Sequence, residues 1–486
     1  MTESDWRQHV PKPVFEQNAG LVELYWKAWE LAHDHIKHLE GLPQSPYMDE
    51  AFSDTNIWIW DTCFMAHFCK YAADSFPGIE SLKNFYAPMH DGVTSPMMIH
   101  ILDNPPLFAW TEIAYYKLTA DHAHLDQLLH RDQYLQKHFK WFDTVQPDYV
   151  LPHSPTSAPV CLKRIADGYF WEGGRSGMDN TVRGRTGAHA VCARPNNPDM
   201  LWVDAVAQQG LSALCIARMA NALGDVELAA TYEVEYEKLK CLVNDLYWNE
   251  EEGIYYDIHA ETKAHMKVKT PASFWPMLAE MCTEEQAARL VELVKDPTIF
   301  GGPIPWVSLA RNDADFCEGD GDYWRGGVWL PTAYMGIKAL AKYGYDELAA
   351  KTSLEILEHM LETYRTFIPH TIWECYNPSE PVPAKHRGKQ VRPDFCGWSA
   401  LGPISLFIED VLGFQVIDAA QKQVVWWLHQ EGRHGIQNLY FGDIHADMMT
   451  DGKGKVSVSS SGAYTLIIHG HAYEIEAGTK TFQLRT

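Results

Sequence analysis

The sequence has no run of about 18 consecutive apolar residues, the length that a membrane-spanning helix needs. Its opening residues, MTESDWRQHVPKPVFEQN, contain no charged segment followed by an apolar one, so no secretory signal is predicted. The ten cysteines form no C-x-x-C pair and lie mostly in apolar segments, which excludes an obvious disulfide framework or zinc site. We therefore expect a cytoplasmic protein with free, buried thiols.

Positive charge is also scarce. The chain has 40 Lys and Arg against 64 Asp and Glu, a formal net charge of −24. Such a chain repels phosphate backbones and offers no basic stripe for anionic lipid. We expect neither nucleic acid nor a membrane as a partner.

Aromatic residues, in contrast, are abundant, with 18 Trp and 23 Tyr among 486 residues. Most of the tryptophans are expected to pack in a large core. Some of them, however, accompany carboxylates in loops, where aromatic rings can line a sugar pocket.

Apolar residues spaced by three and four predict paired helices along most of the chain. The predicted helical segments are 20–38, a segment ending near 71, 107–120, 121–145, 200–223, 225–247, 273–295, 327–344, 346–364 and 398–412. Pairs recur every ~40–60 residues without a short fixed period, which favours a closed ring of inner and outer helices over a solenoid. We therefore predict an all-α (α/α)6 barrel over residues 1–412, with residues 146–199 as a long functional loop.

After residue 412 the pattern changes to alternating apolar and polar residues, as in 455–459 and 464–469, with turn signals at 451–452 and 477–478. Residues 413–486 are therefore predicted to form a small β-rich module. Three roles remain open for it: supporting the side of the barrel, completing the rim of its funnel, or forming a homo-oligomer.

The first candidate for chemistry is Asp179. It follows the aromatic run 169–171 on a Gly-rich bend, where a side chain can reach a cleft. The second is Glu374, which lies in another aromatic loop, Trp373-Glu374-Cys375-Tyr376-Asn377-Pro378. Two carboxylates among aromatic rings indicate a glycosidase, with one acting as general acid and one as general base.

Two other local patterns each allow a structural and a functional interpretation. Asp61 opens a predicted helix, so it is either an N-terminal cap or a ligand of two sugar hydroxyls beside Trp60. The histidines of segment 121–145 do not share one helical face with an acid, which disfavours a metal site there.

Taken in order, a set of short motifs resembles glycoside hydrolase family 63. The motifs are Trp60-Asp61, Asn104-Pro105-Pro106, Ser176-Gly177-Met178-Asp179-Asn180, Tyr323-Trp324-Arg325-Gly326-x-x-Trp329, Glu374-x-Tyr376-Asn377-Pro378 and Gly397-Trp398. The closest likeness is to the short bacterial branch of mannosylglycerate and glucosylglycerate hydrolases and related α-glucosidases, and family 37 trehalases are more distant cousins. The likeness spans residues 20–412.

This resemblance implies an inverting α-glycosidase on an (α/α)6 barrel with no metal and no cofactor, acting on a small carbohydrate. It implies Asp179 as general acid and Glu374 as general base. The residues implied to bind the substrate are Trp60, Asp61, Asn104, Trp171, Gly177, Tyr323, Trp324, Arg325, Trp329, Tyr376 and Trp398. The expected substrate is an α-glucoside or α-mannoside: a disaccharide, a short oligosaccharide or a glycosylglycerate. Asn104 stands where the branch tends to have glutamine.

Several alternatives stay open. Glu172 is a rival for the role of general acid, and Arg183 or Arg185 could contact an acidic aglycone. A sugar isomerase or epimerase would use a pair of histidines from His153, His370 and His386. A catalytically idle glycan-binding protein would have at least one of the two carboxylates turned away from the funnel.

Overall fold

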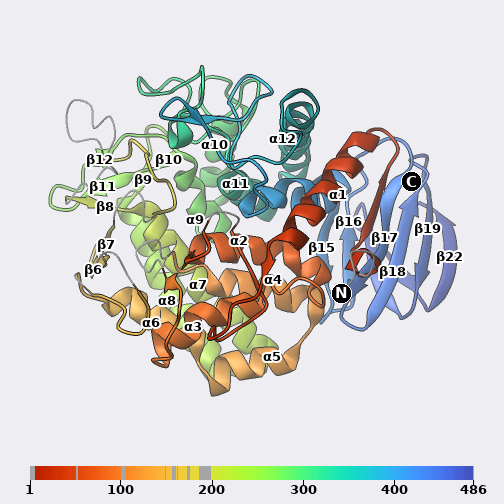
Figure 1. The fold of residues 1–486 in the computed structure, drawn as a ribbon, viewed down its shortest axis with the longest axis horizontal. Coiled ribbons are helices and arrows are strands. Elements are labelled where there is room, and N and C mark those ends of the chain that lie inside the picture. Colours follow the sequence, from red (N-terminus) through yellow and green to blue (C-terminus); the bar gives the residue numbers. More distant parts are fainter. Residues whose placement is uncertain are drawn as a thin grey trace.

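The structure is a computed structural model of the chain, and it describes residues 6–50, 53–99, 105–147, 149–155, 160, 162–171, 176–184 and 199–484. A large helical region stands beside a smaller β region formed by the C-terminal residues (Figure 1). Within the described ranges, no helix is both long and apolar enough to cross a membrane.

The α-helices are α1 (Ala19–Asp34), α2 (Ile59–Cys69), α3 (Lys83–His90), α4 (Phe108–Thr119), α5 (His122–Asp126), α6 (Tyr134–Thr144), α7 (Val203–Ala222), α8 (Val226–Leu246), α9 (Trp275–Leu278), α10 (Glu284–Lys295), α11 (Leu330–Lys342) and α12 (Asp346–Thr366). The short and non-α helices are η1 (Trp6–Gln8), η2 (Lys70–Ala72), η3 (Glu80–Leu82), η4 (Gln127–Arg131), η6 (Pro271–Phe274), η7 (Tyr323–Arg325), η8 (Trp398–Leu401) and η9 (Gly402–Val411).

One set of helices packs in a cyclic order. Helix α2 contacts α4, α4 contacts α7, α7 contacts α9, α9 contacts α11, α11 contacts η8, and η8 returns to α2. A second set packs outside them, with α8 against α7 and α12 against both α11 and η9. The packing follows from the sequence. Helix α7 is buried along most of its length, including polar residues such as Asp204 and Gln208, whereas α8 buries one stripe of residues spaced by three and four.

Most predicted helices are confirmed within a few residues, but three segments differ. Helix α3 has no predicted counterpart. The segment 121–145 is divided into α5, the π-helical η4 and α6, with Gln133 in the left-handed region at φ 55°. The final segment is a 3-10 helix followed by the π-helix η9, which continues straight into the β region.

The C-terminal region consists of two sheets. Its strands are β15 (Phe414–Asp418), β16 (Gln423–Trp426), β17 (His434–Phe441), β18 (Ile444–Thr450), β19 (Lys455–Ser460), β20 (Tyr464–Ile468), β21 (His471–Ile475) and β22 (Gly478–Gln483). One sheet has the order β15-β16-β20-β21, and the other contains β17-β18-β19-β22. Their inner faces meet through ring pairs such as Phe441 with Tyr464 and Tyr473 with Phe482. The predicted alternation is confirmed, since burial along β19 and β20 alternates residue by residue.

The N-terminal segment also belongs to this region, which the sequence analysis did not predict. Strand β1 (Lys12–Phe15) pairs antiparallel with β17 at the edge of the second sheet, with Lys12 opposite Gln437. Pro13 suits an edge strand because it has no backbone N–H to donate to a further neighbour. The first and last described segments consequently both lie on the β side of the molecule (Figure 1).

Short strands connect the helices. They are β2 (Ile36–Lys37), β3 (Tyr47–Met48), β4 (Asn56–Ile57), β5 (Met98–Ile99), β6 (Lys163–Ile165), β7 (Gly168–Phe170), β8 (Met200–Leu201), β9 (Trp248–Asn249), β10 (Ile254–Tyr255), β11 (Asp257–His259), β12 (His265–Met266), β13 (Lys385–His386) and β14 (Lys389–Gln390). Strands β6, β7, β8, β11 and β12 form one sheet, and the segment that carries Asp179 lies between β7 and β8 in the chain.

Candidate active site

The loop that carries Asp179 is held against Trp60. Gly177 has φ +83°, and a Cβ built on it would lie 2.8 Å from atoms of the Trp60 indole. Only glycine permits both this conformation and this close approach. The backbone two residues before Asp179 therefore rests on the Trp60 ring, at the start of α2.

Arg183 fixes the far end of the same loop. Its guanidinium donates to both carboxylate oxygens of Asp204 at 2.7 and 2.9 Å, and to both of Asp257 at 2.6 and 2.8 Å. It is 1% exposed and lies over the Trp202 ring. Its donors are occupied by the protein, so the hypothesis that Arg183 contacts an acidic aglycone is wrong. This arginine instead joins the loop to α7 and β11.

Asn180 connects the Asp179 loop to η7. Its side-chain amide donates to the carbonyl of Asp322 at 2.9 Å, and its oxygen accepts from the N–H of Trp324 at 2.7 Å. The residue between these two anchors is Tyr323. The acid loop and the Tyr323 turn are therefore held in register by one side chain.

Tyr323 in turn contacts Glu374. Its hydroxyl donates to Glu374 Oε1 at 2.7 Å. Burial, followed by the negative charges of Glu374 and Asp179, raises the pKa of Tyr323 well above its usual value. Both carboxylates therefore act on the same phenol, although they are 195 positions apart in the sequence (374 − 179). Asp179 is partly exposed, whereas Glu374 is 2% exposed.

The backbone around Glu374 is fixed from several sides. The Glu374 N–H donates to the carbonyl of Arg392, and its carbonyl accepts from Trp398 Nε1 at 2.9 Å and from Ser399 Oγ at 3.1 Å. The Arg392 N–H donates to Glu374 Oε2 at 3.2 Å. A carboxylate held in this way keeps a single orientation, as a catalytic group requires.

The predicted aromatic residues surround this contact. The rings of Trp324 and Trp329 stack with their centroids 4.1 Å apart. Trp329 Nε1 donates to the carbonyl of Tyr323 at 3.0 Å. The Trp329 ring also approaches that of Trp398 at 5.7 Å. All these tryptophans are buried, so they shape the site from behind, and contact between any of them and a sugar stays a prediction.

Three further candidates have structural contacts of their own. Arg325 pairs with Asp322 at 3.3 Å and Asp315 at 3.5 Å. The hydroxyl of Tyr376, which is 1% exposed, accepts from the N–H of Trp373. Trp171 is buried and packs edge-on against Phe142. Substrate contacts for these residues also stay predictions.

Asp61 lies inside the first turn of α2, and the N-cap residue is Trp58, so the alternative that Asp61 caps the helix is wrong. Asp61 is 4% exposed and lies near Glu50. Burial and the charge of Asp61 raise the pKa of Glu50 well above its usual value, and Glu50 Oε1 accepts from the N–H of Trp58 at 2.9 Å. A role for Asp61 in holding sugar hydroxyls remains open.

Some predicted residues lie outside the described ranges: Asn104, the rival acid Glu172, and Arg185. Among the described residues, no group of three or more His, Cys, Asp or Glu is arranged to hold a metal ion. The described cysteines are free.

Sequence reasoning missed two residues at this site. Arg392 binds Glu374 through its backbone, and its guanidinium is 3.6 Å from Oε1. His386, suggested only for an isomerase, stacks on Tyr323 at 4.2 Å with nearly parallel rings. His370 lies elsewhere and bonds to the carbonyl of Tyr364, so these two histidines do not form a catalytic pair. No local motif marks either residue: His386 lies in the two-residue strand β13, and Arg392 follows β14 outside any helix or strand.

Comparison with known proteins identifies the family of the chain. The family model of the mannosylglycerate hydrolase MGH1-like glycoside hydrolase domain matches residues 56–388, more than half of the chain. The chain belongs to this family. The matched range includes both Asp179 and Glu374. The protein is therefore a glycoside hydrolase, as the motifs predicted.

Individual relatives agree with the family. An uncharacterized protein of Borreliella burgdorferi is 26% identical over 454 residues, covering 89% of this chain and 88% of that protein. A mannosylglycerate hydrolase of Rubrobacter radiotolerans is 27% identical over 161 residues, which are 32% of this chain and 36% of that hydrolase. The match therefore spans only about a third of its length.

Among solved structures, the glycoside hydrolase family 63 mannosylglycerate hydrolase of Thermus thermophilus, in complex with glucose, superposes with a TM-score of 0.57 at 16% identity. The match covers 79% of this chain and 99% of that one. At this identity the likeness shows a shared fold.

Proposed function

We propose that the protein is an inverting α-glycoside hydrolase, with Asp179 as general acid and Glu374 as general base. Its substrate would be an α-glucoside or α-mannoside, either a short saccharide or a glycosylglycerate. The observation that carries the proposal is the link between the two carboxylates through Tyr323, Asn180 and η7.

The fold proposed for this activity is an (α/α)6 barrel. The cyclic order of contacts from α2 through α4, α7, α9, α11 and η8 supports it. Several candidate residues lie at the N-terminal ends of these helices: Trp60 and Asp61 in the first turn of α2, Trp329 at the N-cap of α11, and Trp398 at the start of η8. They would surround one funnel.

In the proposed reaction, Asp179 donates its proton to the glycosidic oxygen as the bond to the anomeric carbon breaks. Glu374 removes a proton from a water that attacks the opposite face of the sugar. An inverting pair keeps its carboxyl groups about 6.5–9.5 Å apart so that this water fits. The partly exposed Asp179 would face the leaving group, and the buried, oriented Glu374 would hold the water.

The test combines stereochemistry with matched variants. Hydrolysis of a panel of α-glucosides and α-mannosides, glycosylglycerates included, is followed by proton NMR. The sugar released first should be the β-anomer. Asp179→Asn and Glu374→Gln should each lower kcat on the order of 10³-fold or more. Glu380→Gln, an exposed glutamate in the same loop as Glu374, is the control and should retain activity.

Release of the α-anomer would refute inversion. Full activity in Asp179→Asn, combined with loss of activity in Glu172→Gln, would transfer the role of acid to Glu172. Activity that survives in Glu374→Gln would remove the proposed base.

A further inference from the structure

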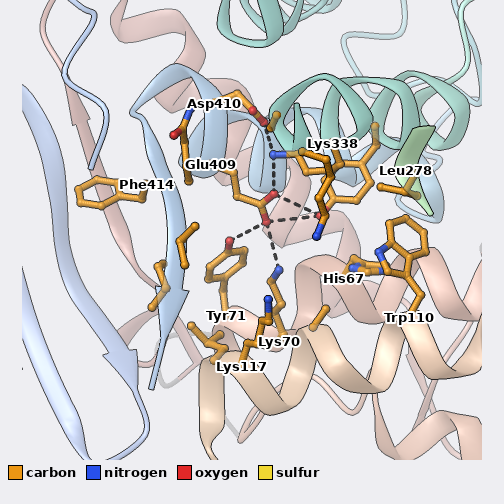
Figure 2. A pocket seen from close by; sticks show the side chains of 18 of the residues that line it. His67, Lys70, Tyr71, Trp110, Lys117, Leu278, Lys338, Glu409, Asp410 and Phe414 are labelled. Atoms are coloured by element: carbon orange, nitrogen blue, oxygen red, sulfur yellow. Dashed lines mark hydrogen bonds and ion pairs between the residues drawn. The ribbon is translucent and has the colours of Figure 1, made fainter. Parts of the chain in front are cut away.

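A cavity lies between the helices and the C-terminal β region (Figure 2). Its volume is about 260 Å³. It is lined by residues of α2, α4, α9, α11 and η9, and strand β15 of the C-terminal region closes one side. The volume is slightly below the ~300–1,000 Å³ typical of drug-sized ligands, so it suits a small molecule.

The cavity is separated from the candidate site by aromatic rings. The rings of Trp60, Trp275, Trp110 and His67 form a continuous series. Their successive centroid distances are 6.4 Å, 5.9 Å and 4.1 Å. Trp60 belongs to the candidate active site, while Trp110 and His67 line the cavity. The cavity is therefore a distinct space.

Lysines reach the cavity from different helices. Lys70 follows α2, Lys117 belongs to α4, and Lys338 and Lys342 belong to α11. Figure 2 shows Lys70, Lys117 and Lys338 directed toward the region around Glu409. Cations are favoured at helix C-terminal ends, but that effect alone does not require four of them to share one cavity.

Most of these charges are neutralised within the protein. Glu409 accepts from Lys70 at 3.1 Å and Lys338 at 2.9 Å, and Lys338 also pairs with Asp410 at 2.6 Å. Burial would raise the pKa of Glu409, but the two lysines hold it well below its usual value. Lys342 pairs with Glu280 at 2.7 Å.

Lys117 differs from the other lysines. Within the part of the chain that the structure describes, its side-chain ammonium has no hydrogen bond and no ion pair. Burial and the positive charge of Lys342 lower its pKa. The charge of Asp418 raises the pKa of Lys117, but burial and Lys342 outweigh it. This half-buried ammonium is therefore only partly compensated, and leaving a buried charge uncompensated is costly.

His67 is the second polar group without a partner. It is 1% exposed, it lines the cavity, and neither of its ring nitrogens has a hydrogen bond among the described residues. Burial, and then the charge of Lys70, lower its pKa to about 3. The neutral ring therefore offers one N–H donor and one acceptor nitrogen.

We propose that this cavity binds a small hydroxylated oxyanion, such as a phosphorylated polyol, through Lys117 and His67. The oxyanion group supplies the counter-charge of Lys117. A hydroxyl and an anionic oxygen satisfy the acceptor and donor nitrogens of His67, and the carbon chain lies against Trp110 and Leu278.

The experiment uses glycerol 3-phosphate as the probe and the full-length protein. Isothermal titration calorimetry should give saturable binding of one molecule per chain, with a matching rise in Tm. Glycerol at the same concentration and potassium chloride at the same ionic strength should give neither effect. In Lys117→Met the Kd should be weaker by at least about tenfold, because a charge-assisted hydrogen bond is lost.

Controls separate this site from others. Lys140→Met removes an exposed lysine of α6 and should bind the probe as the wild type does. Glu374→Gln should also bind it unchanged, which places the probe away from the active site. His67→Phe keeps the ring but removes both nitrogens, so it should fold and bind more weakly.

Lys117→Met should fold at least as well as the wild type without the probe, because it removes an unpaired buried charge. If it does not fold, His67→Phe provides the same comparison. The proposal is overturned if the probe does not bind, if it binds Lys117→Met and His67→Phe as tightly as wild type, or if Glu374→Gln abolishes binding.

Discussion

The hydroxyl of Tyr323 donates to Oε1 of Glu374 at 2.7 Å, although the backbone of Tyr323 has φ +66°. A tyrosine in the left-handed region is strained by about 1–3 kcal/mol. Its neighbours maintain this conformation, because Asn180 binds the backbone on either side of it. This backbone conformation places the phenol hydroxyl of Tyr323 within hydrogen-bond distance of the proposed base, Glu374.

Replacement of Tyr323 by Phe should lower kcat by roughly tenfold or more and leave KM nearly unchanged. The reason is that a hydrogen bond to a charged group contributes about 1.5–3 kcal/mol, and about 1.36 kcal/mol corresponds to a factor of ten in rate. Steady-state kinetics on the best substrate tests this. Tyr440→Phe, an exposed tyrosine of β17, is the control. An unchanged kcat in Tyr323→Phe would mean that the phenol does not assist Glu374.

Gly177→Ala should displace the acid loop, because its Cβ would meet the Trp60 ring at 2.8 Å. A shift of about 1 Å in a catalytic group can cost on the order of 10²-fold in rate. Gly224→Ala is a matched control: Gly224 has a similar φ of +77°, and no atom lies within 4 Å of the position that a Cβ would take there. Both variants carry the backbone strain of a positive φ, but only Gly177→Ala should lose activity. Equal activities would show that the contact with Trp60 is dispensable.

Arg183→Met should lower the free energy of unfolding by about 3–5 kcal/mol, since it leaves Asp204 and Asp257 buried without their shared cation. Urea denaturation measures the change. Arg131→Met removes a largely exposed arginine that pairs with Asp126, and it should cost under about 1 kcal/mol. A similar small loss for both variants would contradict a structural role for Arg183.

The ion pair between His124 and Glu112 should make stability depend on pH. His124 Nε2 is 2.7 Å from Glu112 Oε2, and the charge of Glu112 raises the pKa of His124 to about 9. Because the folded-state pKa is above the unfolded value of about 6.5, the contribution is full below about pH 6.5. It is lost as the pH rises through about 9.

The stability difference between the wild type and His124→Gln should therefore be largest near pH 6 and shrink steadily toward pH 9. Urea unfolding at a series of pH values measures it. His122→Gln, an exposed neighbour that contacts Tyr116, is the control and should show no such trend. A constant difference across this range would show that the pair does not titrate as described.

Periodicity predicted the helices that bury one long stripe or are buried along most of their length, such as α7, α8 and α12. It did not predict α3, which has eight residues and contains Pro88. It also could not place β1 in a sheet, because its partner β17 lies far away in the sequence. Long-range pairing leaves no local pattern in a four-residue strand.

For the site, the ordered motifs identified Asp179, Tyr323 and Glu374, and the structure links all three. They could not show the partners of Arg183, which depend on carboxylates from two other elements. Nor could they identify His386, whose ring reaches Tyr323 from a separate hairpin. Contacts between side chains that form only in the tertiary fold leave no pattern in the sequence around each residue.

The pairing of β1 with β17 also affects how the protein is made. Lys12 is synthesised 425 residues before its neighbour Gln437 (437 − 12). At a synthesis rate of about 5–20 residues per second, β1 remains unpaired for roughly 20–85 s before β17 has been made. The sheet that receives β1 can close only after β17 has been made, so β1 stays unpaired while the whole helical region between them is synthesised.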